Sequence, residues 1–154
     1  MPAPAPIQKT RPYRLLVVAN ETLGCAADAC AVVERHGTSD VEVLVVSPAL
    51  GGRLERWTSD DGPRRAAEER LSRCLGALRA AGARAEGIVG DDDPLLAIDD
   101  SLRLFDADEI LLATRPSRSS GWLALDLAER ARKRYAQRVT HVVGELGDPD
   151  AIAA

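Results

Sequence analysis

The feature that most constrains this chain is an abrupt change of pattern between residues 85 and 105. An apolar, strand-like run from Ala85 to Val89 comes first, and Gly90, three aspartates and Pro94 then lead into an apolar run with helical spacing. Glycine permits a turn with positive φ, an aspartate side chain can cap a helix N-terminus, and proline fits the first helical turn. The stretch therefore predicts a strand-to-helix crossover, with Gly90 turning at positive φ.

The same alternation recurs along the chain. Continuous apolar runs rich in branched residues are typical of strands buried on both faces, and the segments between them have apolar residues at helical spacing. Five strands alternating with four helices require parallel strands and right-handed crossovers. We therefore predict an α/β three-layer sandwich with a five-stranded parallel sheet of order 3-2-1-4-5. The expected strands are 14–19, 41–47, 84–89, 109–113 and 139–143. The first expected helix ends near residue 36, and the other three cover 64–81, 95–105 and 122–135.

Length and composition bound the class of protein. A chain of 154 residues with 45% hydrophobic and 29% charged residues is typical of one soluble domain. We expect a disordered lead-in at 1–12, the α/β domain at 13–144 and a flexible tail at 145–154. The lead-in lacks the apolar core of a signal peptide, and no apolar run approaches the roughly 20 residues of a membrane span. These features indicate a cytoplasmic protein that does not bind membranes.

The charged, cysteine and histidine residues exclude several functions. The net charge of -4 argues against non-specific nucleic-acid binding. Cys25, Cys30 and Cys74 are odd in number and lack metal-ligand spacing, and His36 and His141 lie far apart, so we expect no metal site. No nucleophile elbow, phosphate-binding loop of the Walker type or His/Cys pair is present. We therefore expect no enzymatic activity.

The predicted topology places a ligand site. Doubly wound sheets bind ligands outside the carboxyl ends of strands, at the point where the strand order reverses. In the order 3-2-1-4-5 this point lies between the first and fourth strands, so the turn at 20–24 and the loop at 114–121 should share a crevice. The candidate ligand-binding residues are Asn20, Glu21, Thr22, Gly90, Asp91, Thr114, Arg115, Arg118, Ser119 and Ser120.

Two polar clusters each allow a ligand-binding and a purely structural interpretation. Arg115 and Arg118, with serines before a helix, suit a phosphate group, but Ser119 or Ser120 could simply cap that helix. The aspartates at 91–93 could bind a divalent metal, but such a run more often caps a helix. We favour the cap in both cases.

Four stretches in order along residues 13–143 resemble the universal stress protein family. The strand ending at residues 20–22, Asn-Glu-Thr, resembles the family's strand ending in Asp-Gly-Ser. Residues 90–98 resemble its Gly-Asp-Pro-x-x-Ala-Ile crossover, with two extra aspartates, and residues 107–112 resemble its Ala-Asp-x-Ile-Val-Val strand start. Residues 138–143 resemble its Pro-Val-x-x-Val last strand. The resemblance implies a non-catalytic stress or regulatory protein with an adenine nucleotide as cofactor.

One departure from the family pattern bears on the ligand. ATP-binding members follow the fourth strand with Gly-x2-Gly-x9-Gly-Ser or Gly-Thr, whose bare amides approach the phosphates. Here these positions fall at Ala113, Pro116 and Leu125–Asp126, and the family's first-strand aspartate is Asn20. Proline donates no N–H and an aspartate repels phosphate. We expect a degenerate pocket with weak or no ATP binding; the alternative is a phosphate-bearing ligand held by the Arg/Ser loop.

The last strand is the expected partner surface. An edge strand has unpaired backbone groups that invite pairing, and the resemblance implies a homodimer here. The residues involved would be Val139, His141 and Val143.

A response-regulator receiver is a third alternative with the same alternation. Receivers need an acidic pair after the first strand and a lysine after the fifth. The first strand ends in Asn20-Glu21, and the only lysines are Lys9 and Lys133, so we disfavour this alternative.

Overall fold

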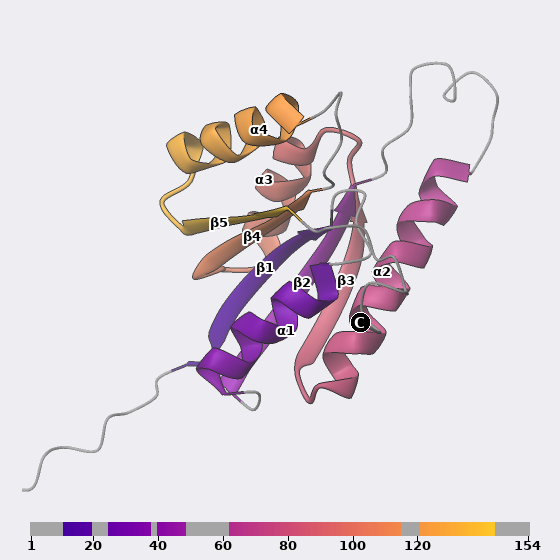
Figure 1. Ribbon diagram of the computed structural model, residues 1–154, viewed down its shortest axis with the longest axis vertical. Helices are drawn as coiled ribbons and strands as arrows, with labels where there is room; N and C mark the ends of the chain where they lie inside the picture. Colours follow the sequence, from indigo (N-terminus) through magenta and orange to yellow (C-terminus); the bar gives the residue numbers. More distant parts are fainter. Residues whose placement is uncertain (1–10, 20–24, 38–39, 49–61, 115–120, 144–154) are drawn as a thin grey trace, which may run out of the picture.

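The computed structural model describes residues 11–19, 25–37, 40–48, 62–114 and 121–143. They form five parallel strands in the order β3-β2-β1-β4-β5, which confirms the predicted fold class and strand order. The helices α1 and α2 cover one face of the sheet and α3 and α4 the other (Figure 1). The elements are β1 Tyr13–Ala19, α1 Cys25–His36, β2 Val41–Pro48, α2 Gly62–Ala80, β3 Arg84–Gly90, α3 Pro94–Leu104, β4 Glu109–Thr114, α4 Gly121–Arg134 and β5 Arg138–Val143.

The central strand β1 shows why the apolar runs are continuous. Leu15 and Val17 pack with α1 and α2, whereas Leu16 and Val18 pack with α3 and α4. All four side chains are fully buried. A strand with helices on both faces must be apolar at every position, since successive side chains point to opposite faces.

Two glycines end helices at positive φ, and Gly90 has a different role. Gly37 follows α1 with φ 84°, and Gly82 follows α2 with φ 92°. Gly90 was expected to turn at positive φ, and that prediction is wrong: it is the last residue of β3, paired with Pro48. A Cβ on Gly90 would lie 2.8 Å from the Cβ of Ala97. Glycine is needed there because α3 packs closely on the strand.

The aspartates after Gly90 confirm the capping interpretation. Asp93 is the N-cap of α3, and its carboxylate accepts a hydrogen bond from the amide of Leu95 at 3.0 Å. Pro94 occupies the first turn, and Asp91 accepts a hydrogen bond from the amide of Asp93 at 3.0 Å. Side chains thus satisfy two of the amides at the start of α3.

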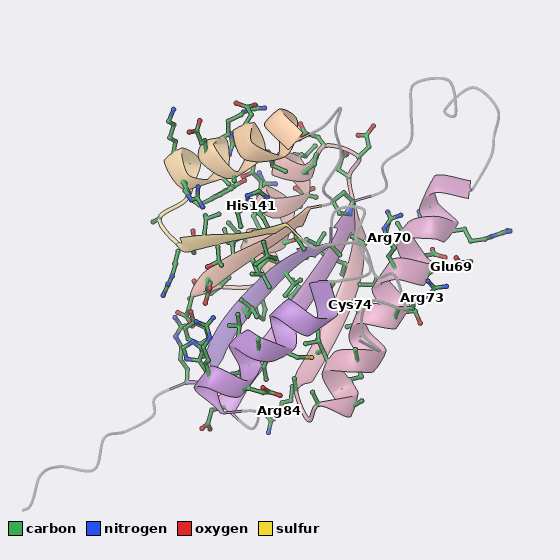
Figure 2. The ribbon with its side chains drawn as sticks, viewed as in Figure 1. Glu69, Arg70, Arg73, Cys74, Arg84 and His141 are labelled. Carbon is green, nitrogen blue, oxygen red and sulfur yellow. The ribbon has the colours of Figure 1, made fainter. Side chains whose placement is uncertain are left out.

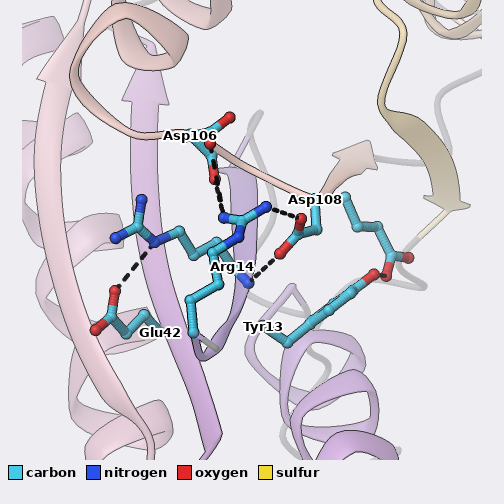
Figure 3. Close-up of polar contacts among 7 residues, drawn as sticks. Tyr13, Arg14, Glu42, Asp106 and Asp108 are labelled. Atoms are coloured by element: carbon cyan, nitrogen blue, oxygen red, sulfur yellow. Dashed lines mark hydrogen bonds and ion pairs between the residues drawn. The ribbon is translucent and has the colours of Figure 1, made fainter. Parts of the chain in front are cut away.

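A polar network joins the amino ends of β1 and β4 (Figure 3). A hydrogen bond from Thr140 extends this network to β5. Glu109 is 2% exposed, and its two carboxylate oxygens accept hydrogen bonds from the Tyr13 hydroxyl and the Thr140 hydroxyl, each at 2.7 Å. Beside it, Asp108 accepts hydrogen bonds from the Arg11 guanidinium and the Arg14 amide. A buried carboxylate is tolerated here because hydrogen bonds replace those it loses to water.

Candidate functional site at the carboxyl ends of the strands

The strand order reverses between β1 and β4, as expected. These strands are parallel neighbours, and their register pairs Ala19 with Ala113 at the carboxyl ends. Asn20 directly follows Ala19, and Thr114 is the last residue of β4. The backbones that lead into the two predicted ligand-binding segments therefore leave the sheet side by side, which is the geometry of a ligand crevice in this class of fold.

Most of the predicted site residues lie outside the described residues. These are Asn20, Glu21, Thr22, Arg115, Arg118, Ser119 and Ser120, and for Thr114 only the backbone at the end of β4 is described. Their contribution to a ligand site stays a prediction.

Gly90 and Asp91 lie at a different place on the same edge. Gly90 is the last residue of β3 and Asp91 follows it. Since β2 separates β3 from β1, both residues are about 10 Å from the end of β1 at the usual strand spacing. Gly90 contacts α3, and the Asp91 carboxylate bonds to the backbone of the helix cap. In the described structure both have structural roles.

The carboxyl end of β2 contributes two polar groups that the sequence patterns did not single out. Ser47 is fully buried, and its hydroxyl has no hydrogen-bond partner among the described residues. Arg70, from α2, donates one hydrogen bond to the carbonyl of Pro48 at 3.3 Å, while its buried Nε has no partner in the described part of the chain. Figure 2 shows Arg70 between α2 and the carboxyl ends of β2 and β3. Buried polar groups without partners are rare, and they mark positions where a ligand or water can complete the bonding.

A signal for Ser47 was present in the sequence. It is the only uncharged polar residue in the β2 run Val-Glu-Val-Leu-Val-Val-Ser-Pro, and it stands where that run ends. Arg70 had no comparable signal, because an arginine on an amphipathic helix is ordinarily solvent-exposed. Together the two groups can supply an N–H and an O–H donor to a ligand, but they contain no nucleophile paired with a base.

The described groups with shifted pKa values lie elsewhere. Asp99 of α3 accepts two hydrogen bonds from Arg134 of α4, and the hydroxyl of Tyr135 donates to it at 2.7 Å. The Arg134 bonds in particular hold the pKa of Asp99 below its usual value. Burial, and then the bond to Asp99, raises the pKa of Tyr135. This cluster fastens α3 to α4.

The strand β5 forms one edge of the sheet and β3 the other. His141 lies half-buried on β5 (Figure 2), and burial, followed by the nearby Arg132, lowers its pKa. The imidazole is therefore neutral at pH 7 more often than the imidazole of an exposed histidine. A neutral side chain fits a half-buried position at the edge of the sheet.

Neither a metal site nor a membrane span is found in the described part of the chain. Within those residues, no group of three or more histidine, cysteine or acidic side chains could hold a metal ion. Among the described helices, none combines the length and apolar character needed to cross a bilayer.

Comparison with known proteins identifies the fold. No protein-family model and no curated protein sequence matches the chain. Solved structures do match. A universal stress protein from Archaeoglobus fulgidus superposes with a TM-score of 0.60 at 21% identity, over 87% of this chain and 96% of that one.

Several of the matching structures contain a nucleotide. An Archaeoglobus fulgidus universal stress protein in complex with dAMP matches with a TM-score of 0.56 at 20% identity, covering 84% of this chain and 96% of that one. A universal stress protein family protein from Arabidopsis thaliana with AMP bound matches with a TM-score of 0.60 at 16% identity, covering 90% and 95%. The chain described here has the fold of the universal stress proteins.

Proposed function

We propose that this chain is a cytoplasmic, non-catalytic protein of the universal stress type, with a regulatory or stress-related role and a degenerate nucleotide pocket. The observation that carries this proposal is the adjacency of β1 and β4 in a universal stress protein fold. Two structures of this fold contain AMP or dAMP, which supports an adenine nucleotide as the ligand class.

The residues around this crevice argue for weak or absent ATP binding. The sequence has Ala113 and Pro116 where amide-donating glycines bind phosphate in the ATP-binding members, and Asn20 in place of the acidic residue. A triphosphate carries up to four negative charges and needs several converging N–H donors. Without them the affinity for ATP should fall more than the affinity for AMP.

Isothermal titration calorimetry with ATP, ADP, AMP and cyclic AMP tests the proposal. We expect no ATP binding tighter than about 100 μM, a free energy of about -5.5 kcal/mol. ATP binding in the low micromolar range would contradict the degenerate pocket.

A second candidate function is binding of a phosphate-bearing ligand through the Arg/Ser loop. One observation favours it: α4 begins at Gly121, directly after Ser120, and is 14 residues long. Arg115, Arg118, Ser119 and Ser120 therefore precede a helix N-terminus, where anions are favoured. Replacing both arginines by alanine should abolish any rise in melting temperature that AMP or ADP causes in the wild type. An unchanged rise would reject the loop as the site.

We further propose a homodimer through β5. Its outer edge has no neighbouring strand in the described sheet, and Val139 and His141 are only half-buried. Pairing with the same strand of a second copy, involving Val139, His141 and Val143, would continue the sheet across the two copies. Light scattering at micromolar concentration should give twice the monomer mass of 16.5 kDa. A His141→Pro variant, which cannot donate an amide hydrogen bond, should shift the mass toward the monomer.

A further inference from the structure

A surface cavity of about 530 Å³ lies at the amino ends of β2 and β3, at the opposite end of the sheet from the nucleotide crevice. Its volume is within the range of small-molecule sites. Figure 2 shows Arg84 at the lower end of β3, well away from Arg70 at the carboxyl end. The cavity is lined by Glu42, Val43, Leu44, Arg79, Ala83, Arg84, Ala85, Glu86 and Phe105.

A row of alternating charges crosses three strands beside this cavity. The strand register pairs Arg14 with Glu42 and Glu42 with Arg84. The Nε of Arg14 lies 3.4 Å from a carboxylate oxygen of Glu42, and its guanidinium carbon lies 5.7 Å from the centre of the Phe105 ring. Arg14 and Glu42 thus neutralise each other, and Arg84 is the third member of the row.

The Arg79 guanidinium is already engaged. Its Nε and one terminal nitrogen donate hydrogen bonds to the carbonyl of Ala85, at 3.1 and 2.9 Å. This contact satisfies a backbone carbonyl of the edge strand β3. The position of the Arg79 side chain is therefore explained without a ligand.

Arg84 and Glu86 are the charges that remain available. Ile88 of the same strand packs with α3 and α4, so Arg84 and Glu86, at even spacing from it, share that face. Both side chains are exposed, and neither makes an ion pair or hydrogen bond with another residue in the described ranges. Their Cα atoms are about 7 Å apart, and two long side chains can reach a single molecule from there.

The cavity between these charges also has an apolar part. Leu44 is 7% exposed and lies across from Glu86 in the register of β2 and β3. Phe105, half-buried at the end of α3, adds an aromatic ring. The site therefore combines one available cation, one available anion and an apolar surface.

We propose that this cavity binds a zwitterionic small molecule with an apolar side chain, of the α-amino-acid type. Arg84 binds the carboxylate, Glu86 binds the ammonium group, and Leu44 with Phe105 contacts the side chain. A simple anion would be repelled by Glu86 and a simple cation by Arg84, so only a ligand with both charges gains from both residues.

The test is a titration of the full-length, ¹⁵N-labelled protein followed by NMR. L-Phenylalanine should cause saturable shifts at the amides of residues 42–44 and 84–86. 3-Phenylpropionate lacks the ammonium group and phenethylamine lacks the carboxylate, so each should bind at least tenfold more weakly. Absence of saturable shifts with L-phenylalanine, or equal affinity for all three compounds, would overturn the proposal.

Two variants test the roles of Arg84 and Glu86 in binding the charged groups of the ligand. Arg84→Gln and Glu86→Gln should each lower the affinity for L-phenylalanine at least fivefold. Arg73→Gln, which removes an exposed arginine of α2 away from the cavity, should leave it unchanged. Both cavity residues are exposed, so the dispersion of the amide spectrum should be retained. Equal affinity in wild type, Arg84→Gln and Glu86→Gln would reject these roles, whatever the result of the AMP titration.

Discussion

Buried Glu109 and buried Ser47 lie at opposite ends of the same sheet and differ in how their polar atoms are satisfied. Both oxygens of Glu109 accept hydrogen bonds, from Tyr13 and from Thr140, whereas the hydroxyl of Ser47 has no partner within the described ranges. The polar groups around Glu109, at the amino ends of β1, β4 and β5, are thus organised for stability. The carboxyl end of β2 keeps bonding capacity unused, as expected where a ligand approaches.

The largest loss of stability should come from a substitution of Glu109, whose polar atoms are hydrogen-bonded. Glu109→Ala leaves the hydroxyls of Tyr13 and Thr140 without their acceptor and opens a cavity, so we expect a loss of about 3 kcal/mol in the free energy of unfolding. Urea denaturation measures it. The exposed Glu129→Ala change should cost less than about 0.5 kcal/mol. A loss below about 1 kcal/mol for Glu109→Ala would mean that this network does not stabilise the sheet.

A second variant tests how tightly the carboxyl end is packed. In Gly90→Ala the new Cβ would lie 2.8 Å from both Ala97 and Val46, so we expect destabilisation of about 2 kcal/mol from overpacking. The matched control is Gly76→Ala in α2, where a Cβ meets nothing within 4 Å. Removing a helix-interior glycine should stabilise the protein by up to about 1 kcal/mol. Thermal melts of the two variants should shift in opposite directions, and a shared direction would contradict the close contact.

A third prediction concerns pH and the clamp between α3 and α4. The folded state lowers the pKa of Asp99, chiefly through Arg134, so the carboxylate stabilises the fold above its unfolded pKa of about 4. This contribution is lost as the pH falls through the lower folded value. Wild type should therefore exceed Asp99→Asn in stability at pH 7, and the difference should shrink between about pH 5 and pH 2. A difference that does not change with pH would show that the charge of Asp99 is not the cause.

The smallest change in stability should come from a substitution of Ser47, at the carboxyl end of β2. Ser47→Ala removes a buried hydroxyl that no described residue bonds, so the free energy of unfolding should stay within about 0.5 kcal/mol of wild type or rise slightly. Chemical denaturation without ligand measures it. A loss above about 1 kcal/mol would show that Ser47 has a structural partner, and the contrast between the two ends would no longer hold.

The elements of the fold could be predicted with little error, because each boundary has a local cause. Gly37 and Gly82 end helices, Asp93 and Pro94 begin one, and the apolar runs match the five strands. Gly90 is the instructive failure. A glycine between a strand and an aspartate suggests a turn, but here the requirement for glycine comes from α3, whose Ala97 would meet a Cβ at that position.

Only part of the candidate site could be predicted from the sequence. Topology placed the crevice between β1 and β4 because strand order follows from connection rules. Ser47 and Arg70 were missed because they are 23 positions apart on a strand and a helix, and no local pattern relates such residues. The cavity at the amino ends of β2 and β3 was missed for the same reason, since its residues come from β2, β3 and the ends of two helices.

The sequence by itself determined the alternation of five strands and four helices and the parallel sheet, because periodicity, caps and glycine positions act over a few residues. Only the tertiary structure decided which polar groups are satisfied. The acceptor for Tyr13 lies 96 residues away, and Arg84 meets its cavity through the pairing of β2 and β3. Hydrogen bonds and ion pairs act over a few ångströms, so they depend on how distant segments pack rather than on the order of residues along the chain.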